Sequence, residues 1–332
     1  MADRTKVMLR RERMEITLPL LIDLFATSKQ TEGRSPKTVD WYRWLLGKFV
    51  GFLGDKLKLA QLSVDDARAF VAALQARDCR YENHPLAGKQ PGGLSPYTIH
   101  GYVRTLKVFS TWLHEEGFTK TDLFARLKRP KLPEPMVEVL SDQEIGQLVE
   151  AINPNSFLGA RLYAMVLLLL DTGIRGSELC SLTLDNTDLD QGTIKVLGKG
   201  RKERIVPFGA GTKKALLRYL TAFRPESTAQ TAFVNPEGGP MNAGSLLQAL
   251  KRLGRRSGVE RLHPHLLRRT FAVKYLMAGG DVMTLRLILG HTTLDVTKLY
   301  LHLAESHIKL VYHKFSPVDR LGIGNRKLAK LR

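Results

Sequence analysis

Cysteines and metal-binding motifs are scarce in this sequence. Of its 332 residues only two are cysteines, Cys79 and Cys180, and neither belongs to a CxxC pair. The chain has no HExxH motif, and its nine histidines show no ligand spacing. A disulfide framework and a zinc site both need such patterns. We therefore expect no disulfide and no metal ion.

Long apolar runs are also missing. The longest, Ala164–Leu170, is far shorter than the ~20 residues that cross a bilayer. The first residues, MADRTKVMLRRERMEI, are basic and lack the apolar core of a signal peptide. The stretch Gly192–Lys199 resembles a phosphate-binding loop, but no Ser or Thr follows its lysine. We therefore expect no membrane partner, no ATP and no other cofactor.

Acidic residues are few relative to basic ones. The chain has 51 Lys and Arg against 32 Asp and Glu, which gives a net charge of +19. An excess this large predicts a polyanionic partner. Nucleic acid is the leading candidate, and an anionic membrane surface is the weaker one because no apolar segment supports it. We expect the protein to act in the cytoplasm, in contact with the nucleoid.

The chain is long enough for two domains, each with a core of its own. Residues 128–138, KRPKLPEPMVE, contain three prolines and no periodicity, which is typical of an extended linker. We therefore divide the sequence into a basic leader (1–14), a helical domain (15–127), the linker (128–138), a second domain (139–315) and a polar tail (316–332).

The first domain is predicted to be helical. A helical pattern starts near Thr17, Ser63 begins another helix, and residues 80–94 are rich in Gly and Pro, as in a loop. Ser35 and Ser95 each precede a proline, a combination typical of a capped helix start. Basic and hydroxyl side chains close to these two starts suit contacts with phosphates and grooves, although two solvated helix faces are the alternative. The candidate DNA contacts are Lys37, Thr38, Arg43, Thr98, His100, Arg104 and Lys107.

The second domain mixes helices with a little β structure. Arg161–Asp171 is apolar enough for a buried helix. Gly192–Leu197 and Arg204–Phe208 have β-type composition, and the charged turn between them contains glycine, as in an antiparallel hairpin. Arg201 and Lys202 in this turn are further candidate DNA contacts. We expect a mainly α fold with a small antiparallel β-sheet in the second domain.

Tyr300 is the candidate nucleophile. Gly290 ends an apolar run, and Tyr300 lies about two turns into the helix predicted after it, with His291 at the start of that helix. A tyrosine hydroxyl attacks poorly until its proton is removed and its target is polarised. The alternative is that Tyr300, one of nine tyrosines, merely packs.

The second domain contains the cations that such an attack would need. Arg175 lies in an apolar setting, where a charge is costly unless it is paired, and Glu178 is its candidate partner. His265 and Arg268 are three residues apart and share a helical face, while Lys199 lies at the hairpin tip. Around one tyrosine, such groups would make a phosphodiester-transfer site that needs no metal, because the cations offset the transition-state charge.

The order of these residues resembles a known family. The motifs TGIRGSEL, LGKGRKERIVP, HPHLLRRTFA, LGH and TKLYLH are similar to those of the tyrosine recombinases, or phage integrases. Six positions match in type and order, and the flanking residues match too. The helical first domain resembles the family's core-binding domain, more by pattern than by motif. The resemblance implies two domains that form a clamp around DNA.

The resemblance also implies a mechanism. Tyr300 would attack a DNA phosphate, which gives a 3′-phosphotyrosyl link and a free 5′-hydroxyl. Arg175 and Arg268 would clamp the phosphate, and His291 would donate a further hydrogen bond. The 5′-hydroxyl of another strand would then attack the link and reseal the DNA without ATP.

Three further positions carry supporting roles by resemblance. Lys199 would be the general acid for the leaving 5′-oxygen, and His265 would assist proton transfer at the tyrosine. Glu178 corresponds to an acidic position that supports the first arginine.

The family also suggests an assembly. Its partners are double-stranded recombination sites, held by a homo-tetramer that forms from a monomer or dimer on each site. A C-terminal segment, here the residues from Ala304 onward, docks on the neighbouring protomer. No arm-binding domain is expected before residue 15, as in the simple recombinases. Accessory proteins are left open.

Two alternative functions stay open from the sequence. A type IB topoisomerase uses a similar set of residues to relax DNA, and a protein of the same fold could bind DNA without cutting it. Chromosome-dimer resolution, integration of a phage or conjugative element, and transposon resolution all fit a recombinase.

Overall fold

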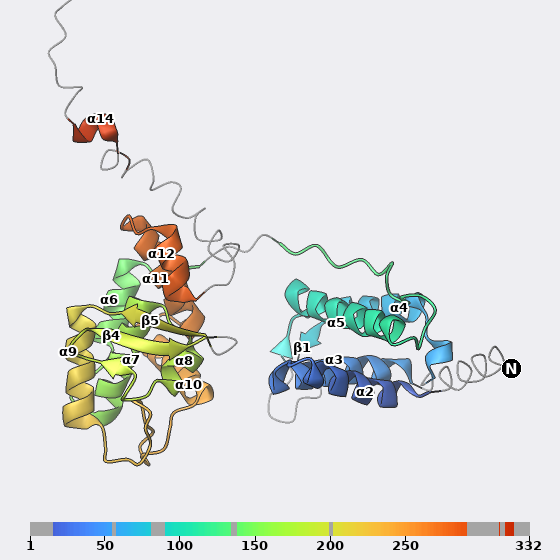
Figure 1. Cartoon of the computed structure of the whole chain (residues 1–332), viewed down its shortest axis with the longest axis horizontal. Helices are drawn as coiled ribbons and strands as arrows, with labels where there is room; N and C mark the ends of the chain where they lie inside the picture. The colour runs from blue at the N-terminus through green and yellow to red at the C-terminus, as the bar shows by residue number, and fades with distance from the viewer. Residues whose placement is uncertain are drawn as a thin grey trace, which may run out of the picture. The chain divides into compact units, whose positions relative to one another are not determined.

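The computed structural model of the chain describes residues 16–54, 58–80, 90–133, 138–198, 202–290, 312 and 316–321. The chain divides into two compact units, residues 1–135 and 136–332, and the division falls within the proline-rich stretch 128–138 (Figure 1). Within the described ranges, no helix is both long and apolar enough to cross a membrane.

The first unit is built from helices whose starts the sequence predicts. They are α2 (Leu18–Thr31), α3 (Pro36–Leu53), α4 (Val64–Gln75) and α5 (Pro96–Glu115), with a 3₁₀ turn, η1, at Leu59–Gln61. The hydroxyls of Ser35, Ser63 and Ser95 accept hydrogen bonds from the backbone N–H three residues on, so each caps its helix.

Part of the predicted loop 80–94 is instead β structure. Strands β1 (Cys79–Arg80) and β2 (Gln90–Pro91) pair antiparallel. Two residues are too few to show the alternation that marks a strand, so no sequence pattern announces this ladder.

Aromatic rings fill the core of the first unit. The ring of Phe25 lies 5.4 Å from those of Phe109 and Trp112, and the rings of Phe49 and Phe70 are 5.2 Å apart. Such pairs each contribute about 0.5–1.5 kcal/mol beyond the area they bury. They join α2, α3, α4 and α5 into one core that contains no buried ion pair among the described residues.

The second unit combines helices with a small sheet, which confirms the predicted fold class. Strands β3 (Thr187–Asp188), β4 (Thr193–Leu197) and β5 (Glu203–Pro207) form an antiparallel sheet in that order, with Ile194 opposite Val206. The predicted hairpin is therefore present, and β3 is an addition to it. The helices are α6 (Asp142–Glu150), α7 (Phe157–Thr172), α8 (Gly176–Ser181), α9 (Ala210–Arg218), the π turn η2 (Tyr219–Phe223), α10 (Ala243–Ser257), α11 (Pro264–Met277), α12 (Val282–Leu289) and α14 (Pro317–Arg320).

Helix α7 is the central element of the second unit. It packs against α8, α9, α11 and η2, which explains why its sequence is apolar on nearly every side. It ends at Gly173, whose φ of +60° is the left-handed conformation that glycine adopts readily. A Cβ at Gly173 would lie 2.3 Å from Cδ1 of Phe271, so this close approach to α11 needs glycine as well.

Candidate active site

The end of α7 leads directly to the first predicted catalytic residue, Arg175, which is the N-cap of α8. Its backbone N–H donates to Oε2 of Glu178 at 2.8 Å, and its Nη1 donates to Oε1 at 2.7 Å. The pairing that the sequence spacing predicts is therefore present. The Glu178 side chain is 3% exposed, whereas the Arg175 side chain keeps 30% of its surface exposed, so only the arginine can reach a ligand.

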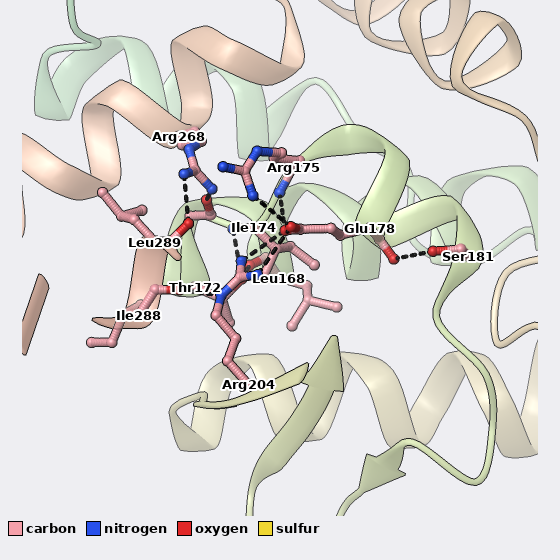
Figure 2. A network of polar contacts seen from close by, with 11 residues as sticks. Leu168, Thr172, Ile174, Arg175, Glu178, Ser181, Arg204, Arg268, Ile288 and Leu289 are labelled. Atoms are coloured by element: carbon pink, nitrogen blue, oxygen red, sulfur yellow. Dashed lines mark hydrogen bonds and ion pairs between the residues drawn. The ribbon is translucent and has the colours of Figure 1, made fainter. Parts of the chain in front are cut away.

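A second arginine holds the same carboxylate, and it is not among the site residues predicted from the sequence. Arg204 on β5 donates from Nη1 to Oε1 of Glu178 at 3.0 Å and from Nη2 to Oε2 at 2.7 Å. Its Nε donates to the carbonyl of Ile288, in the last turn of α12, at 2.7 Å. Figure 2 shows Arg175 and Arg204 both pointing toward Glu178.

The buried Glu178 carboxyl stays ionised because of these contacts. Burial by itself would raise the pKa of Glu178, but hydrogen bonds from Arg204 and Arg175 outweigh it, so this pKa lies below its ordinary value. The site therefore holds a fixed negative charge shared between two arginines.

Arg268 on α11 lies beside this network and is 4% exposed. Its Nη1 donates to the carbonyl of Gly173 and its Nη2 to the carbonyl of Leu289, both at 2.7 Å (Figure 2). Arg268 thus joins the end of α7 to the end of α12. The structure brings Arg175, Glu178 and Arg268 together, an arrangement that the family resemblance implies and that sequence spacing alone does not show.

His265 lies one turn before Arg268, in the first turn of α11 after Pro264, and keeps an exposed surface. Partial desolvation, together with the positive charge of Arg268 and other nearby cations, lowers the pKa of His265. The ring is therefore neutral at neutral pH and able to accept a proton.

Several predicted site residues lie outside the described residues. They are Lys199, Arg201, His291 and Tyr300. The structure describes Gly198 and Lys202, on either side of residues 199–201, and Gly290, just before residue 291. The backbone N–H of Gly198 donates to the carbonyl of Lys202 at 2.8 Å, between the end of β4 and the start of β5, and Lys202 is exposed. Gly290 ends α12 with a φ of +64°, as its position after an apolar run predicts.

The predicted DNA contacts of the first unit lie on α3 and α5. Lys37 and Arg104 are exposed, and His100 is half-buried. Thr38 and Thr98 each share a hydrogen bond with the capping serine three residues before them. Arg43 lies 3.4 Å from the carboxylate of Asp23, and both side chains are exposed.

Lys107 has a different role from the one its sequence position suggests. Its ammonium donates to the carbonyls of Phe124, Ala125 and Leu127 at 3.1, 2.7 and 3.1 Å. An ammonium has three donors, and all three are used here. Lys107 therefore fixes the turn after α5 rather than offering its charge to a partner, and we leave it out of the DNA surface.

Two exposed tryptophans on α3 are not among the DNA contacts predicted from the sequence. Trp41 is 47% exposed and Trp44 50%, and their rings stack with centroids 5.4 Å apart. Trp44 also leans on the ring of Tyr102, and a Cβ at Gly101 would lie 4.0 Å from Trp41, so both rings border α5. Their spacing of three residues places both on one face of the helix that also carries Thr38, and this spacing is visible in the sequence.

The described residues contain no group of three or more His, Cys, Asp or Glu side chains placed to hold a metal ion. The charges gathered at the site are instead those of arginines. Fixed guanidinium groups of this kind bind the oxygens of phosphates and carboxylates.

The comparisons with known proteins point to one family. The family model described as the phage integrase family matches residues 138–307. Tyrosine recombinase XerC of Oceanobacillus iheyensis is 34% identical over 310 residues, which cover 90% of this chain and 97% of that protein. Tyrosine recombinase XerC of Xylella fastidiosa is 32% identical over 304 residues, covering 91% and 98%.

A solved structure shares the fold. The Tn1549 transposon integrase in complex with transposon right end DNA superimposes with a TM-score of 0.68 at 19% identity, covering 90% of this chain and 100% of that one. With a matching family model over half of the sequence and relatives of one kind along nearly all of it, this chain belongs to the phage integrase family of tyrosine recombinases.

Proposed function

We propose that this protein is a site-specific DNA recombinase that cuts and rejoins strands through Tyr300. The observation that carries the proposal is the buried network in which Glu178 orients Arg175 beside Arg268. The XerC relatives, which are recombinases by name and match this chain along nearly its whole length, favour this function over a type IB topoisomerase.

The chemistry exchanges one phosphate ester for another. The hydroxyl oxygen of Tyr300 attacks phosphorus, the bond to the 5′-oxygen breaks, and Lys199 protonates that oxygen. His265, neutral at neutral pH, takes up the tyrosine proton. In the second step a 5′-hydroxyl attacks the phosphotyrosine and the tyrosine leaves. No external energy source is needed, because the number of ester bonds does not change.

The two arginines act on the phosphate from different depths. Arg175 is partly exposed and uses Nη1 for Glu178, so it presents its outer face to the non-bridging oxygens. Arg268 is buried and anchored to two carbonyls, and it contributes its charge from within the fold. His291 adds a hydrogen bond to the same phosphate.

The first unit supplies the DNA-binding surface and, with the second, forms a clamp around the duplex. Helices α3 and α5 carry the phosphate-binding side chains Lys37, Arg43 and Arg104, with Thr38, Thr98 and His100 next to them. Trp41 and Trp44 stand exposed on the same pair of helices. Indole rings there suit apolar contact with thymine methyl groups or sugars. Lys202 and Arg201, from the hairpin segment, are the DNA contacts proposed for the second unit.

Two protomers would bind each recombination site, and four would hold two sites together in the cytoplasm. The residues from Ala304 onward would dock on the neighbouring protomer and set the position of Tyr300 from outside its own subunit. A protein truncated after about Phe315 should then cleave poorly or without coordination. Coordinated strand exchange at the full rate by the truncated protein would contradict this part of the proposal.

A covalent adduct tests the function directly. The DNA that the protein binds is first identified by sequencing, and a nicked duplex of that site is mixed with wild-type protein or Tyr300→Phe. We expect a denaturation-resistant adduct with wild type only, at the same rate with and without EDTA. Binding without an adduct would identify a non-catalytic DNA-binding protein instead. Relaxation of supercoiled DNA without strand exchange would indicate a topoisomerase.

A further inference from the structure

We propose that Arg204 is a positioning residue for strand cleavage, because it fixes Glu178, and through it Arg175, against the end of α12. This inference rests on the proposed function, since it concerns the same site. It assigns a role to a residue that need not touch the DNA.

The guanidinium of Arg204 is used on two sides at once. Nη1 and Nη2 grip both carboxylate oxygens of Glu178, and Nε reaches the carbonyl of Ile288. The Arg204 side chain is 12% exposed and that of Glu178 3%, so little water competes for these contacts. A guanidinium has a planar array of donors that can make this two-sided contact, whereas a lysine ammonium cannot grip a carboxylate in parallel while it holds a carbonyl behind.

The end of α12 is held twice by the arginines of the site. Arg204 binds the carbonyl of Ile288, and Arg268 binds the next carbonyl, that of Leu289. The last carbonyls of a helix lack partners within it and attract cations. Gly290 follows, and a Cβ there would lie 3.0 Å from Nη1 of Arg204, so a larger residue would push the arginine away. Arg204 and Arg268 therefore fix the backbone at Ile288 and Leu289, directly before Gly290 of the LGH motif.

The two arginines on Glu178 have different duties. Arg175 approaches from α8 with a partly exposed side chain, and Arg204 approaches from β5 and is nearly enclosed. In the described part of the chain, Arg175 and Arg204 are the charged residues hydrogen-bonded to Glu178. On α11, Arg268 donates to the carbonyls of Gly173 and Leu289, and His265 lies near Arg175. Without Arg204, the buried Glu178 carboxylate would have Arg175 as its remaining arginine partner. It would then attract Arg175 more strongly and pull its guanidinium away from the phosphate.

The experiment compares Arg204→Met and Arg204→Lys with a matched control, Arg261→Met. Arg261 makes the same kind of contact elsewhere in the unit, with both oxygens of Glu144 at 2.6 and 3.1 Å and with the carbonyl of Val139 at 3.3 Å. Each variant is assayed for single-turnover adduct formation at saturating DNA, for DNA affinity, and for its thermal midpoint, between about pH 5 and pH 9.

We expect Arg204→Met to slow adduct formation about 100-fold, as for a misplaced catalytic group, with DNA affinity nearly unchanged. The acid side of its pH–rate profile should move to higher pH, because Glu178 loses the hydrogen bonds that keep it ionised. Arg261→Met should lower the thermal midpoint and leave both the rate and the profile unchanged. In a Glu178→Gln background, Arg204→Met should slow the reaction much less.

If Arg204→Met does not fold, Arg204→Lys carries the test, with a smaller loss of rate and the same direction of the pH shift. A variant of Arg204 that forms the adduct at the wild-type rate, with the wild-type pH profile, overturns this inference while the proposed function stands. A full 100-fold loss in the Glu178→Gln background also overturns it, because Arg204 would then not act through Glu178. Failure of the wild-type protein to form an adduct overturns the proposed function itself.

Discussion

The two units of this protein place their proposed functional residues differently relative to their cores. In the first, aromatic rings such as Phe25, Phe109 and Trp112 fill the core, and the residues proposed to touch DNA stand on the outside of α3 and α5. In the second, Glu178 and Arg268 are 4% exposed, so charged groups proposed for chemistry are part of the interior. Function is therefore separable from folding in the first unit and tied to it in the second.

Burial explains this contrast. A charge inside a protein is tolerated only when it is paired and hydrogen-bonded, so each partner depends on the others. An exposed side chain on a helix is hydrated by water and does not depend on such partners. Its replacement usually changes the free energy of unfolding by less than about 0.5 kcal/mol. Mutations at the buried site of the second unit should therefore change both activity and stability, whereas mutations on the outside of the first unit should change DNA binding alone.

The largest effect is expected for Arg268→Ala. Adduct formation should be lost, and the free energy of unfolding should fall by about 2–5 kcal/mol, because the carbonyls of Gly173 and Leu289 are left without their donor. Denaturant unfolding and the adduct assay check both. Arg218→Ala, which removes a surface hydrogen bond to Asn155, is the control and should change neither. A fully stable Arg268→Ala protein would break the contrast between the units.

His265→Gln should slow adduct formation about 100-fold, as for loss of a general base. Because the pKa of His265 is lowered, the neutral ring persists below the ordinary histidine pKa of about 6.5. On the acid side of the pH–rate profile, the wild-type rate should thus fall only below that value, as the ring protonates. The fall assigned to His265 should be missing from the variant. If, as the pH is lowered, the wild-type rate has already fallen to half of its maximum above pH ~7, this role is contradicted.

Changing Trp41 and Trp44 together to Ala should weaken DNA binding about tenfold, or about 1.4 kcal/mol, because the apolar contact of both rings is lost. Stability and the cleavage rate at saturating DNA should stay close to wild type. Intrinsic fluorescence offers a second measurement, because Trp112, the third tryptophan, is 4% exposed. Bound DNA should protect the two exposed rings from acrylamide, and quenching that DNA does not alter would remove them from the binding surface.

The smallest effect separates two neighbours on α5. Arg104→Gln should reduce the salt dependence of DNA binding by about one phosphate contact and leave stability unchanged. Lys107→Met should instead leave the salt dependence unchanged and lower the free energy of unfolding by about 1–3 kcal/mol. The reason is that the carbonyls of Phe124, Ala125 and Leu127 lose their hydrogen-bond donor. A reduced salt slope for Lys107→Met would return this lysine to the DNA surface.

Local signals in the sequence predict much of the fold. The capping serines, the hairpin of β4 and β5, and the glycines that end α7 and α12 act through neighbouring residues, so sequence spacing reveals them. The pairing of Arg175 with Glu178 is equally local. The two-residue strands β1 and β2 are too short for any periodicity to show.

Long-range partners could not be predicted in this way. Arg204 lies within the quoted motif LGKGRKERIVP, yet its partners Glu178 and Ile288 are 26 and 84 residues away. Lys107 and Arg104 are three apart on one helix, and only the turn at 124–127 decides that the first points inward. The roles of Lys199, Arg201, His291 and Tyr300 stay predictions, since they lie outside the described residues.

The most direct test of this account is the identity of the residue that becomes linked to DNA. Wild-type protein trapped on its nicked site is digested with protease and nuclease, and the remaining nucleotide-bearing peptide is sequenced by mass spectrometry. We expect one modified peptide, in which the 3′-phosphate of a nucleotide is esterified to the hydroxyl of Tyr300. A nucleotide on any other residue, or a 5′-phosphate link, would contradict it.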